Sequence, residues 1–551
     1  MAERVLQPSD RLADTAANPH QDLQTSRPFY ERVAFRVILG LLAYGVIRCI
    51  ARATIKPLWF DELLTQVMAR QHGITALWRA LKTTADGAPP PFYFPFYLMD
   101  RLSAAIPINE HIAYRLPSIV AFSLTLLCLY RFVEWRSGPA AGLLCAGLVF
   151  LTPLFVSYAD EARSYAMLVA CVAFALVCYQ RVPSIPRTRG SWTLSSWSIS
   201  LWTIGLFASL FLAMCLHYYG ILSLAPFFAA ELFLTWQTKR PRPFVWAALM
   251  LATMPLLIFW PLLSPVKAYY SVNLWAKPEF TDVLGSYADF FHVDPQWGFA
   301  LAGLLLAAVL LALFRPAQAA ELVEHSESRE QPPPHEHVLV LGFLLFPWIV
   351  FVFAEVVHGG STPRYFLCGI LGVALAFRYV LDWLPPRLLL ACAGFLLLSF
   401  ALQEFTFWSS FRTAPAPADA ANSLQVLVDS VHREDLPLVM ADSLAYFETL
   451  HYASPALRQR MIALVDPQNA NLYVGTDSLD KNMLALRRVT AVNVQEFSEF
   501  TAAHRSFLLY SDGTAFEWLP SLLVADGESV SLLTEQEDST LYLVVLKPEE
   551  N

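Results

Sequence analysis

Long uninterrupted apolar runs constrain this chain more than any other feature of its sequence. A helix of about 20 apolar residues crosses the hydrocarbon core of a bilayer, and we count about eleven such runs. They lie near residues 33–53, 113–133, 138–157, 164–181, 199–217, 219–236, 244–263, 297–314, 338–357, 365–382 and 387–404. With 56% hydrophobic and 15% charged residues over 551 positions, the chain has too much apolar surface for a water-soluble core. The sequence therefore predicts a polytopic α-helical membrane protein.

Basic residues in the short connections predict how these spans are oriented. Lys and Arg accumulate in cytoplasmic loops. A cytoplasmic amino terminus places on that side Arg131, Arg136, Arg181, Arg187, Arg189, Lys239, Arg240, Arg242, Arg378 and Arg387. The segments predicted to lie outside are then 54–112, 158–163, 264–296, 358–364 and everything after residue 405.

The chain divides into three predicted parts. Residues 1–28 are polar and predict a disordered cytoplasmic tail, and they lack the pattern of a signal peptide. Residues 29–405 form the transmembrane domain, with external loops 54–112 and 264–296. Residues 412–551 alternate short apolar runs with amphipathic stretches, which is typical of a soluble α/β sheet domain. Because this domain has no phosphate loop and no metal-ligand spacing, we expect it to contribute acceptor capture or stability and not the chemical step.

Three external segments hold ionisable residues directly beside membrane spans, where charge is costly unless it has a partner or faces water. They are LWFDE with Asp61 and Glu62, YADEARSYA with Asp160, Glu161, Arg163 and Tyr165, and STPRY with Arg364 and Tyr365. All three fall on one side of the membrane, whereas a transport pathway would spread its charges through the midplane. Together with the proline-aromatic segment 88–94, they predict a reactive site at the external face.

Each of these segments alone also has a structural interpretation. Asp61 and Glu62 are suited to the amino terminus of a helix, where carboxylates are favoured. The acids and the arginine of the YADEARSYA turn could form a local ion pair that closes a tight loop. Arg364 could extend along the interface towards water. Their common location favours the functional interpretation.

The order of these motifs resembles the C-type membrane glycosyltransferases. An Asp-Glu pair is followed by a Pro-Pro-aromatic segment, a Glu-Ala-Arg-x-Tyr-Ala turn, the turn His217-Tyr218-Tyr219-Gly220 and a late Pro-Arg-Tyr. Residues 30–385 are similar to the bacterial relatives of protein O-mannosyltransferases and of the lipid A aminoarabinose transferase. The resemblance implies transfer of a sugar from a polyprenyl-phosphate carrier to a glycan, lipid or protein hydroxyl. The reaction would occur at the external face of the inner membrane.

The resemblance also implies roles for the acidic residues. The catalytic base of the family corresponds to Asp61, with Glu62 beside it, and the acid of the later turn corresponds to Asp160 or Glu161. A lipid phosphate is a good leaving group, so the enzyme mainly needs a carboxylate for the acceptor proton and cations for the phosphate. A single base without a carboxylate nucleophile would give inversion at the anomeric carbon.

Cations and aromatic side chains complete the predicted site. The candidates for binding the donor phosphate are Arg163, Arg364 and Tyr365, since a guanidinium can bind two phosphate oxygens at once. The candidates for a substrate groove are Tyr93, Tyr165, His217 and Tyr218. Some relatives bind a divalent metal through a His or Glu before the Pro-Pro pair; this chain has Ala88 and Pro89 there, and Asp86 is its candidate metal ligand.

Functions other than glycosyl transfer also fit parts of this pattern. A transporter or flippase of lipid-linked saccharides would share the hydrophobicity and need phosphate-binding arginines. The sequence shows no internal inverted repeat and no midplane charge chain, both of which a transporter would favour. A sugar polymerase or ligase would still be a transferase, and a non-catalytic scaffold would leave the acids and arginines unexplained.

The orientation is testable with reporter fusions. A reporter placed after residue 240 should be cytoplasmic, and one placed after residue 420 should be outside, because the basic loops alternate in that phase. A cytoplasmic signal from the second fusion would contradict the external location of the predicted site.

Overall fold

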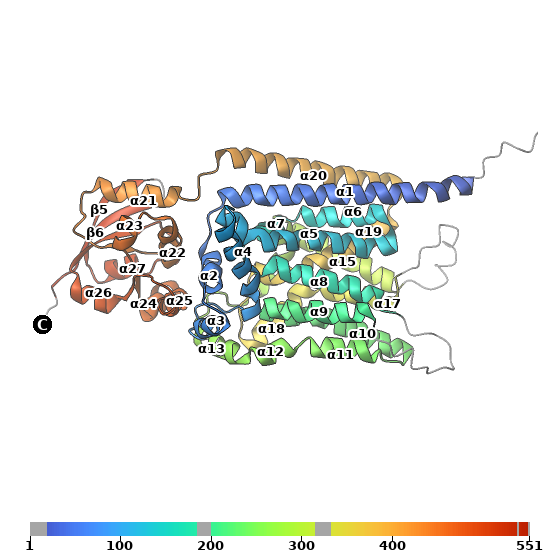
Figure 1. The fold of residues 1–551 in the computed structure, drawn as a ribbon, viewed down its shortest axis with the longest axis horizontal. Coiled ribbons are helices and arrows are strands. Elements are labelled where there is room, and N and C mark those ends of the chain that lie inside the picture. The colour runs from blue at the N-terminus through green and yellow to red at the C-terminus, as the bar shows by residue number, and fades with distance from the viewer. Residues whose placement is uncertain (1–18, 184–199, 315–331, 537–538, 549–551) are drawn as a thin grey trace, which may run out of the picture.

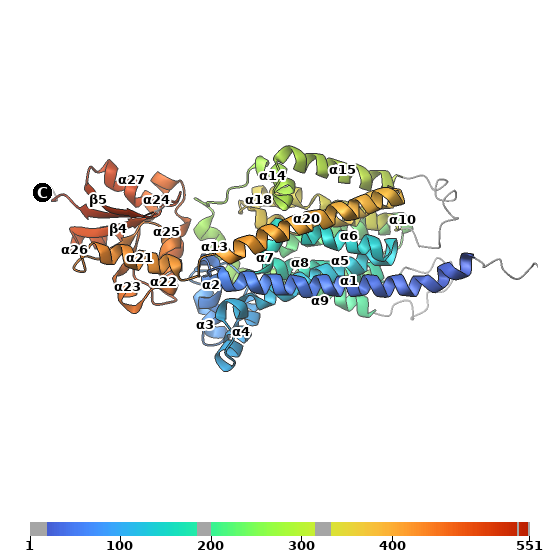
Figure 2. The same cartoon turned by 90° about the horizontal axis from the view of Figure 1, so that it is seen from above.

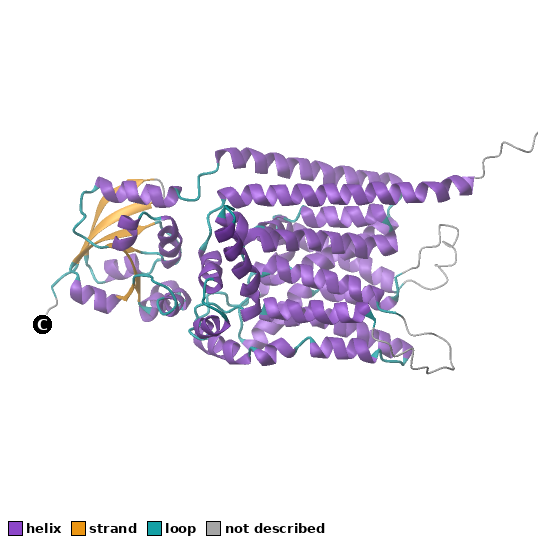
Figure 3. Ribbon diagram, in the orientation of Figure 1, coloured by secondary structure: helices purple, strands orange, loops and turns teal. Residues whose placement is uncertain are grey.

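The computed structural model describes residues 19–183, 200–314, 332–536 and 539–548. Helices form a long bundle, and the strands lie in a carboxy-terminal domain at one end of it (Figure 1, Figure 3). The first helix, α1 (Pro19–Ile55), and the last long helix, α20 (Pro386–Thr413), run along the bundle (Figure 2). The prediction of a helical membrane part followed by a small sheet domain is confirmed.

The helix α1 begins before its apolar run. Residues 19–28, which the sequence assigns to a disordered tail, belong to this helix. The remainder of that tail, residues 1–18, lies outside the described residues. The predicted tail is thus corrected at its carboxy-terminal end. A helix satisfies its own backbone hydrogen bonds and can continue from the bilayer into water.

The remaining helices and 3-10 turns of the bundle follow in chain order. They are α5 (Glu110–Ser137), α6 (Pro139–Phe150), α7 (Pro153–Ala159), α8 (Tyr165–Arg181), α9 (Leu201–Leu216), η3 (Tyr218–Ser223), α10 (Leu224–Thr238), α11 (Pro243–Leu251), α12 (Met254–Ile258), α13 (Trp260–Tyr270), α14 (Phe280–Phe291), α15 (Pro295–Leu313), α17 (Pro334–Leu344), α18 (Phe346–Val357), η4 (Pro363–Phe366) and α19 (Gly369–Trp383). Their buried apolar side chains form one large core.

Each predicted apolar run falls on one helix or on two or three consecutive helical segments, but the count of eleven spans stays a prediction. Among the described residues, five helices are long and apolar enough to cross a membrane, namely Tyr30–Ile55, Glu110–Ser137, Tyr218–Thr238, Pro295–Leu313 and Arg387–Thr413. Three bent helix pairs raise the number to eight, and α8 and α9 are shorter apolar helices. The run predicted at 365–382 is the 15-residue helix α19.

Prolines account for the three bends. The pairs α6–α7, α11/α12–α13 and α17–α18 bend by 76°, 64° and 58°. In each pair the second helix has a proline at its first or second position, Pro153, Pro261 and Pro347 respectively. A proline lacks the backbone N–H of a continuous helix and clashes with the preceding turn.

The two ends of the bundle differ. The connections that hold Arg187, Arg189 and residues 315–331 lie outside the described residues, and the sidedness of the membrane stays a prediction. The opposite end carries α2 (Phe60–Ala69), α3 (Ile74–Leu81), η1 (Pro90–Tyr93) and α4 (Phe94–Ala105), next to the carboxy-terminal domain (Figure 1).

The carboxy-terminal domain contains a six-stranded mixed sheet. Its helices are α21 (Asp419–Ser430), α22 (Ser443–Tyr452), α23 (Pro455–Arg460), α24 (Pro467–Val474), α25 (Ser478–Leu486), α26 (Phe497–Ala503) and α27 (Leu519–Ala525). Its strands are β1 (Leu438–Met440), β2 (Met461–Val465), β3 (Val494–Glu496), β4 (Ser506–Ser511), β5 (Ser529–Gln536) and β6 (Ser539–Val545). The order is β3-β2-β1-β4-β6-β5, with β1 to β4 parallel and β6 antiparallel to both β4 and β5.

The carboxy-terminal domain packs directly against α2 and against the segment after α13. One hydrophobic cluster contains buried residues of the sheet and of α22 together with residues at and just before the start of α2. The latter are Leu58, Phe60, Leu63 and Leu64. A second contact joins α25 to the segment after α13, where Thr476 donates to the carbonyl of Asn273 at 2.7 Å. The domain therefore fixes the loops 54–112 and 264–296 against the membrane bundle.

Candidate functional site

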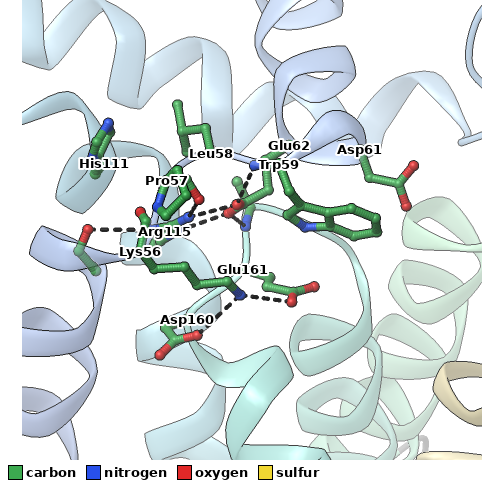
Figure 4. A network of polar contacts seen from close by, with 12 residues as sticks. Lys56, Pro57, Leu58, Trp59, Asp61, Glu62, His111, Arg115, Asp160 and Glu161 are labelled. Carbon is green, nitrogen blue, oxygen red and sulfur yellow. Dashed lines mark hydrogen bonds and ion pairs between the residues drawn. The ribbon is translucent and has the colours of Figure 1, made fainter. Parts of the chain in front are cut away.

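A single arginine organises the segment that leads into α2. Arg115 of α5 is fully buried. One of its terminal nitrogens, Nη1, donates to the carbonyls of Ala53 at 3.1 Å and Lys56 at 2.7 Å, and the other, Nη2, donates to Pro57 at 2.7 Å. These carbonyls lie at the end of α1, where the negative end of the helix dipole favours a cation. Figure 4 shows how Arg115 joins them to Glu62.

Glu62 is the carboxylate partner of Arg115. Its oxygens accept from Arg115 Nε at 2.8 Å and from Nη2 at 2.6 Å, and Oε1 also accepts from the N–H of Ala162 at 2.7 Å. Burial alone would raise the pKa of Glu62, but the charge and hydrogen bonds of Arg115 hold it below its ordinary value. Glu62 is therefore an ionised, fully buried structural carboxylate.

Asp61 points to the other side of the segment. Its side chain faces away from Arg115 and Glu62 (Figure 4), because consecutive helical residues diverge by about 100°. One oxygen, Oδ2, accepts from Arg364 Nη1 at 3.0 Å and lies 3.8 Å from Arg163 Nε. No described residue donates a hydrogen bond to its Oδ1, and the side chain is 17% exposed. One carboxylate oxygen is thus held and the other is available.

Arg163 ties this side of the site together. Its Nη1 lies 3.1 Å from each of three oxygens, the carbonyl of Asp61, the hydroxyl of Thr65 and Oδ2 of Asp86. Its buried Nε has no hydrogen-bond partner among the described residues. The same holds for Nε of Arg364. Each guanidinium beside Asp61 therefore keeps a donor that an anion could use.

Aromatic rings surround Arg364. The guanidinium carbon lies 5.6 Å from the ring centre of Trp275, 5.8 Å from Tyr165, 5.9 Å from Tyr365 and 6.0 Å from Trp59. Rings at these distances stabilise a cation and hold the guanidinium in place. Trp275 comes from the segment between α13 and α14, so the predicted external loop 264–296 contributes to the site.

His217 is a neutral member of the aromatic group. Its ring lies 5.4 Å from Tyr365 and 5.6 Å from Tyr165. Its Nδ1 accepts from the N–H of Tyr219 at 3.1 Å, which leaves the proton on Nε2. The imidazole can therefore donate to a ligand but adds no charge.

Two tyrosines with buried hydroxyls lie near Asp86. The hydroxyls of Tyr93 and Tyr218 have no hydrogen-bond partner among the described residues. Burial and then the charge of Asp86 raise the pKa of Tyr93. Tyr93 also lines an apolar cavity of about 640 Å³ that extends between α2, α3, η1 and α4. Tyr93 therefore separates an apolar space from the charged centre.

The other two predicted acids lie on the side of Glu62. Asp160 lies 3.3 Å from Arg52 Nε and 3.7 Å from Lys56 Nζ, and Glu161 accepts from Lys56 at 2.8 Å (Figure 4). Burial raises the pKa of both carboxyls, although these cations oppose the shift. Their ion pairs hold the turn between α7 and α8 against the end of α1. In the described part of the chain, neither Asp160 nor Glu161 pairs with the side chain of Arg163 or Arg364, so neither belongs to the group around Asp61.

Asp86, the candidate metal ligand, is paired with other groups in the structure, and a metal at this residue stays a prediction. Its Oδ2 accepts from Arg163 at 3.1 Å and its Oδ1 from the N–H of Gly87 at 2.7 Å. Within the described ranges, no group of three His, Cys, Asp or Glu side chains is arranged to hold a metal. Asp86 is the ion-pair partner of Arg163.

The structure thus separates the predicted site residues into two groups. The first surrounds Asp61 and consists of Arg163, Arg364, Tyr365, Tyr165, His217, Tyr218, Tyr93 and Asp86. The second consists of Glu62, Asp160 and Glu161, which pair with cations from α1 and α5. Sequence reasoning missed these cations. A charged residue such as Arg115 inside an apolar helix was the available signal, because it requires a partner.

No protein-family model matches the sequence, and a search of the curated proteins finds no match. Solved structures do match. ArnT from Cupriavidus metallidurans in the apo state has 13% sequence identity and a TM-score of 0.55, covering 93% of this chain and 98% of that chain. The same ArnT bound to undecaprenyl phosphate has 13% identity and a TM-score of 0.52, covering 92% and 97%. The apo oligosaccharyltransferase of Archaeoglobus fulgidus has 11% identity and a TM-score of 0.43, covering 86% and 69%. The predicted resemblance is confirmed at the level of the fold.

The Arg115–Glu62 pair can be tested by its effect on stability. Arg115→Ala should lower the free energy of unfolding by about 3–5 kcal/mol, because it leaves a buried carboxylate unpaired. The measurement is reversible unfolding of the purified protein in detergent.

Arg70→Ala is the matched control. Arg70 pairs with Asp100 at 2.9 Å, but its side chain is 49% exposed, so its loss should cost at most about 1 kcal/mol. Equal losses for the two variants would contradict the assigned role of Arg115.

Proposed function

We propose, since this chain has the fold of the C-type membrane glycosyltransferases, that it transfers a sugar from a polyprenyl-phosphate donor to a hydroxyl acceptor. The observation that carries the proposal is the partly exposed carboxylate of Asp61, held by Arg364 at 3.0 Å and close to Arg163. ArnT has been solved with undecaprenyl phosphate bound, and a lipid phosphate of that class suits two guanidiniums with unused donors. The protein would be a multi-pass protein of the inner membrane.

Asp61 is the proposed general base. Its Oδ2 is fixed by Arg364, and its Oδ1 is open to receive the proton of an acceptor hydroxyl. Glu62 cannot take this role, since both of its oxygens bind Arg115. A base held by a neighbouring cation is already oriented, so little reorganisation accompanies proton transfer.

The two arginines are proposed to hold the donor phosphate. As the anomeric C–O bond to phosphate breaks, negative charge grows on the leaving phosphate oxygens. Guanidinium groups in a water-poor site stabilise such charge strongly, because each offers several fixed donors. Tyr365 lies beside Arg364, and its hydroxyl is proposed to donate to the same anion.

The acceptor hydroxyl attacks the anomeric carbon while Asp61 takes its proton and the phosphate leaves with the bonding electrons. The other predicted acids, Glu62, Asp160 and Glu161, pair with cations, so none of them is a free carboxylate that could act as a nucleophile beside Asp61. A single displacement inverts the anomeric configuration. We therefore propose an inverting reaction.

Neutral and aromatic groups are proposed to bind the sugar and the lipid. Tyr165, His217 and Tyr218 offer ring faces and hydroxyl or N–H donors, a combination that suits a sugar ring. The apolar cavity beyond Tyr93, of about 640 Å³, is proposed to receive the apolar chain of a lipid substrate. Tyr93 would then lie at the boundary between chain and head group.

Asp61→Asn tests the base. The amide keeps the shape but cannot accept the proton, so turnover at saturating donor should fall about 10²- to 10⁴-fold. The measurement is release of polyprenyl phosphate from labelled polyprenyl-phosphate sugars with purified full-length protein. Asp100→Asn, in the same external loop, serves as the control and should retain activity.

Two outcomes would contradict the proposal. Turnover of Asp61→Asn within a few-fold of wild type would remove Asp61 as the base. Movement of the intact lipid-linked sugar across a vesicle membrane, with no release of polyprenyl phosphate by the wild type, would favour a transporter instead.

Arg364→Lys tests phosphate binding. A point charge cannot replace the guanidinium fork, so the KM for the lipid donor should rise about 10- to 100-fold. Arg101→Lys, on the exposed side of α4, is the matched control. An unchanged KM in Arg364→Lys and in Arg364→Ala would exclude Arg364 from the donor site.

A further inference from the structure

The carboxy-terminal domain supplies hydrogen-bond acceptors to the start of α2. The N–H of Leu58 donates to the hydroxyl of Tyr452 at 2.7 Å, and the N–H of Phe60 donates to Oε1 of Glu448 at 2.9 Å. Between them, the N–H of Trp59 donates to Glu62 at 3.3 Å. Three consecutive backbone N–H groups therefore donate to side chains, and two of those side chains belong to the carboxy-terminal domain.

Both acceptors project from the same face of α22. Glu448 and Tyr452 are four residues apart, which brings their side chains together on a helix. Tyr452 also contacts His111 at the start of α5, with 3.1 Å between its hydroxyl and Nε2. The neighbouring His451 lies 3.1 Å from Glu110. The face of α22 is thus anchored to the helix that carries Arg115.

Apolar packing holds the same two helices together. The ring of Phe60 meets that of Phe447 edge to face, with 5.6 Å between ring centres. Leu63 and Leu64 of α2 are buried in the core of the carboxy-terminal domain. Asp61 lies between the buried residues Phe60 and Leu63. Its backbone is therefore held against the carboxy-terminal domain, while its side chain faces Arg364.

We propose that Glu448 and Tyr452 are positioning residues for Asp61: Glu448 caps the first residue of α2, and Tyr452 holds the residue that precedes the N-cap Trp59. The proposal rests on the proposed function and deepens it: a domain to which the sequence assigns no chemical step sets the direction of the catalytic carboxylate. The first N–H groups of a helix have no partner within it, and a side chain that accepts them stabilises the first turn. Asp61 is the second residue of that turn.

The consequence for catalysis follows from geometry. Asp61 keeps its 3.0 Å contact with Arg364 only while the first turn of α2 is formed. Fraying of this turn would move the carboxylate relative to the donor, and a displacement of about 1 Å can cost about 100-fold in rate. The sequence led us to expect no part for this domain in the chemical step, and the contacts give it an indirect one.

The kinetic test compares substitutions at Glu448 in the full-length protein. Glu448→Ala should lower kcat about tenfold, with the KM for the polyprenyl-phosphate sugar unchanged within about twofold, because the donor contacts remain. Glu448→Gln should restore kcat, since its amide oxygen can accept the same N–H. Asp429→Ala, an exposed carboxylate on α21 of the same domain, is the matched control and should behave as wild type.

Hydrogen exchange provides a readout that does not depend on activity. The backbone amides of residues 58–64 should exchange faster in Glu448→Ala and in Tyr452→Phe than in wild type, while those of β2 should not change. If Glu448→Ala does not fold, Tyr452→Phe, which loses one hydroxyl, carries both measurements. Unchanged kcat together with unchanged exchange at residues 58–64 would overturn the inference.

The two proposals fail in different ways. If Asp61→Asn is inactive but Glu448→Ala has wild-type kcat and wild-type exchange, the positioning role is wrong and the proposed base stands. If Asp61→Asn is active, the proposed function is wrong. The catalytic positioning role is then wrong too, even if faster hydrogen exchange at residues 58–64 in Glu448→Ala shows that the cap exists. Loss of kcat in Glu448→Gln equal to that in Glu448→Ala would also contradict capping, because the N–H acceptor is retained.

Discussion

The buried ion pair between Arg115 and Glu62 is the interaction on which the rest of the site depends. Arg115 binds Glu62 with two donors and the carbonyls of Ala53, Lys56 and Pro57 with the remainder. One guanidinium therefore joins the end of α1, the extended segment after it and the start of α2. Removing two charges from water costs several kcal/mol for each ion, and only complete pairing and hydrogen bonding offset this cost.

That constraint gives two neighbouring carboxylates different tasks. Glu62 must face the interior to meet Arg115, and on a helix the preceding side chain then points about 100° away. Asp61 is thereby directed to Arg163 and Arg364, in the partly exposed space lined by aromatic rings. An acid that is fully paired supports the fold, whereas an acid with one open oxygen can accept a proton.

The placement of the carboxy-terminal domain depends on contacts within α20 and beyond it. Within the bundle, Glu404 of α20 forms an ion pair with Arg48 of α1, with 2.7 Å between Oε1 and Nε, and it accepts a hydrogen bond from the hydroxyl of Tyr44. An apolar helix packed mainly against lipid gains little specificity from hydrophobic contact, so polar pairs determine where it lies. Beyond the bundle, the domain shares a hydrophobic core with α2. The chain thus returns to the loop between its first two long helices, α1 and α5, and packs against it.

The sequence by itself determined the membrane class, the small α/β domain and the motifs that form the site, because bilayer-length apolar runs, alternating strands and charges beside spans are local patterns. It missed β5, an exposed edge strand without a buried face that would produce such a pattern. Only the tertiary structure decided which predicted acid meets the arginines, and that α22 caps α2. Glu62 and Arg115 are 53 positions apart, and Phe60 and Glu448 are 388 apart. Pairing over such separations is set by how helices and domains pack, and no local pattern of residues records it.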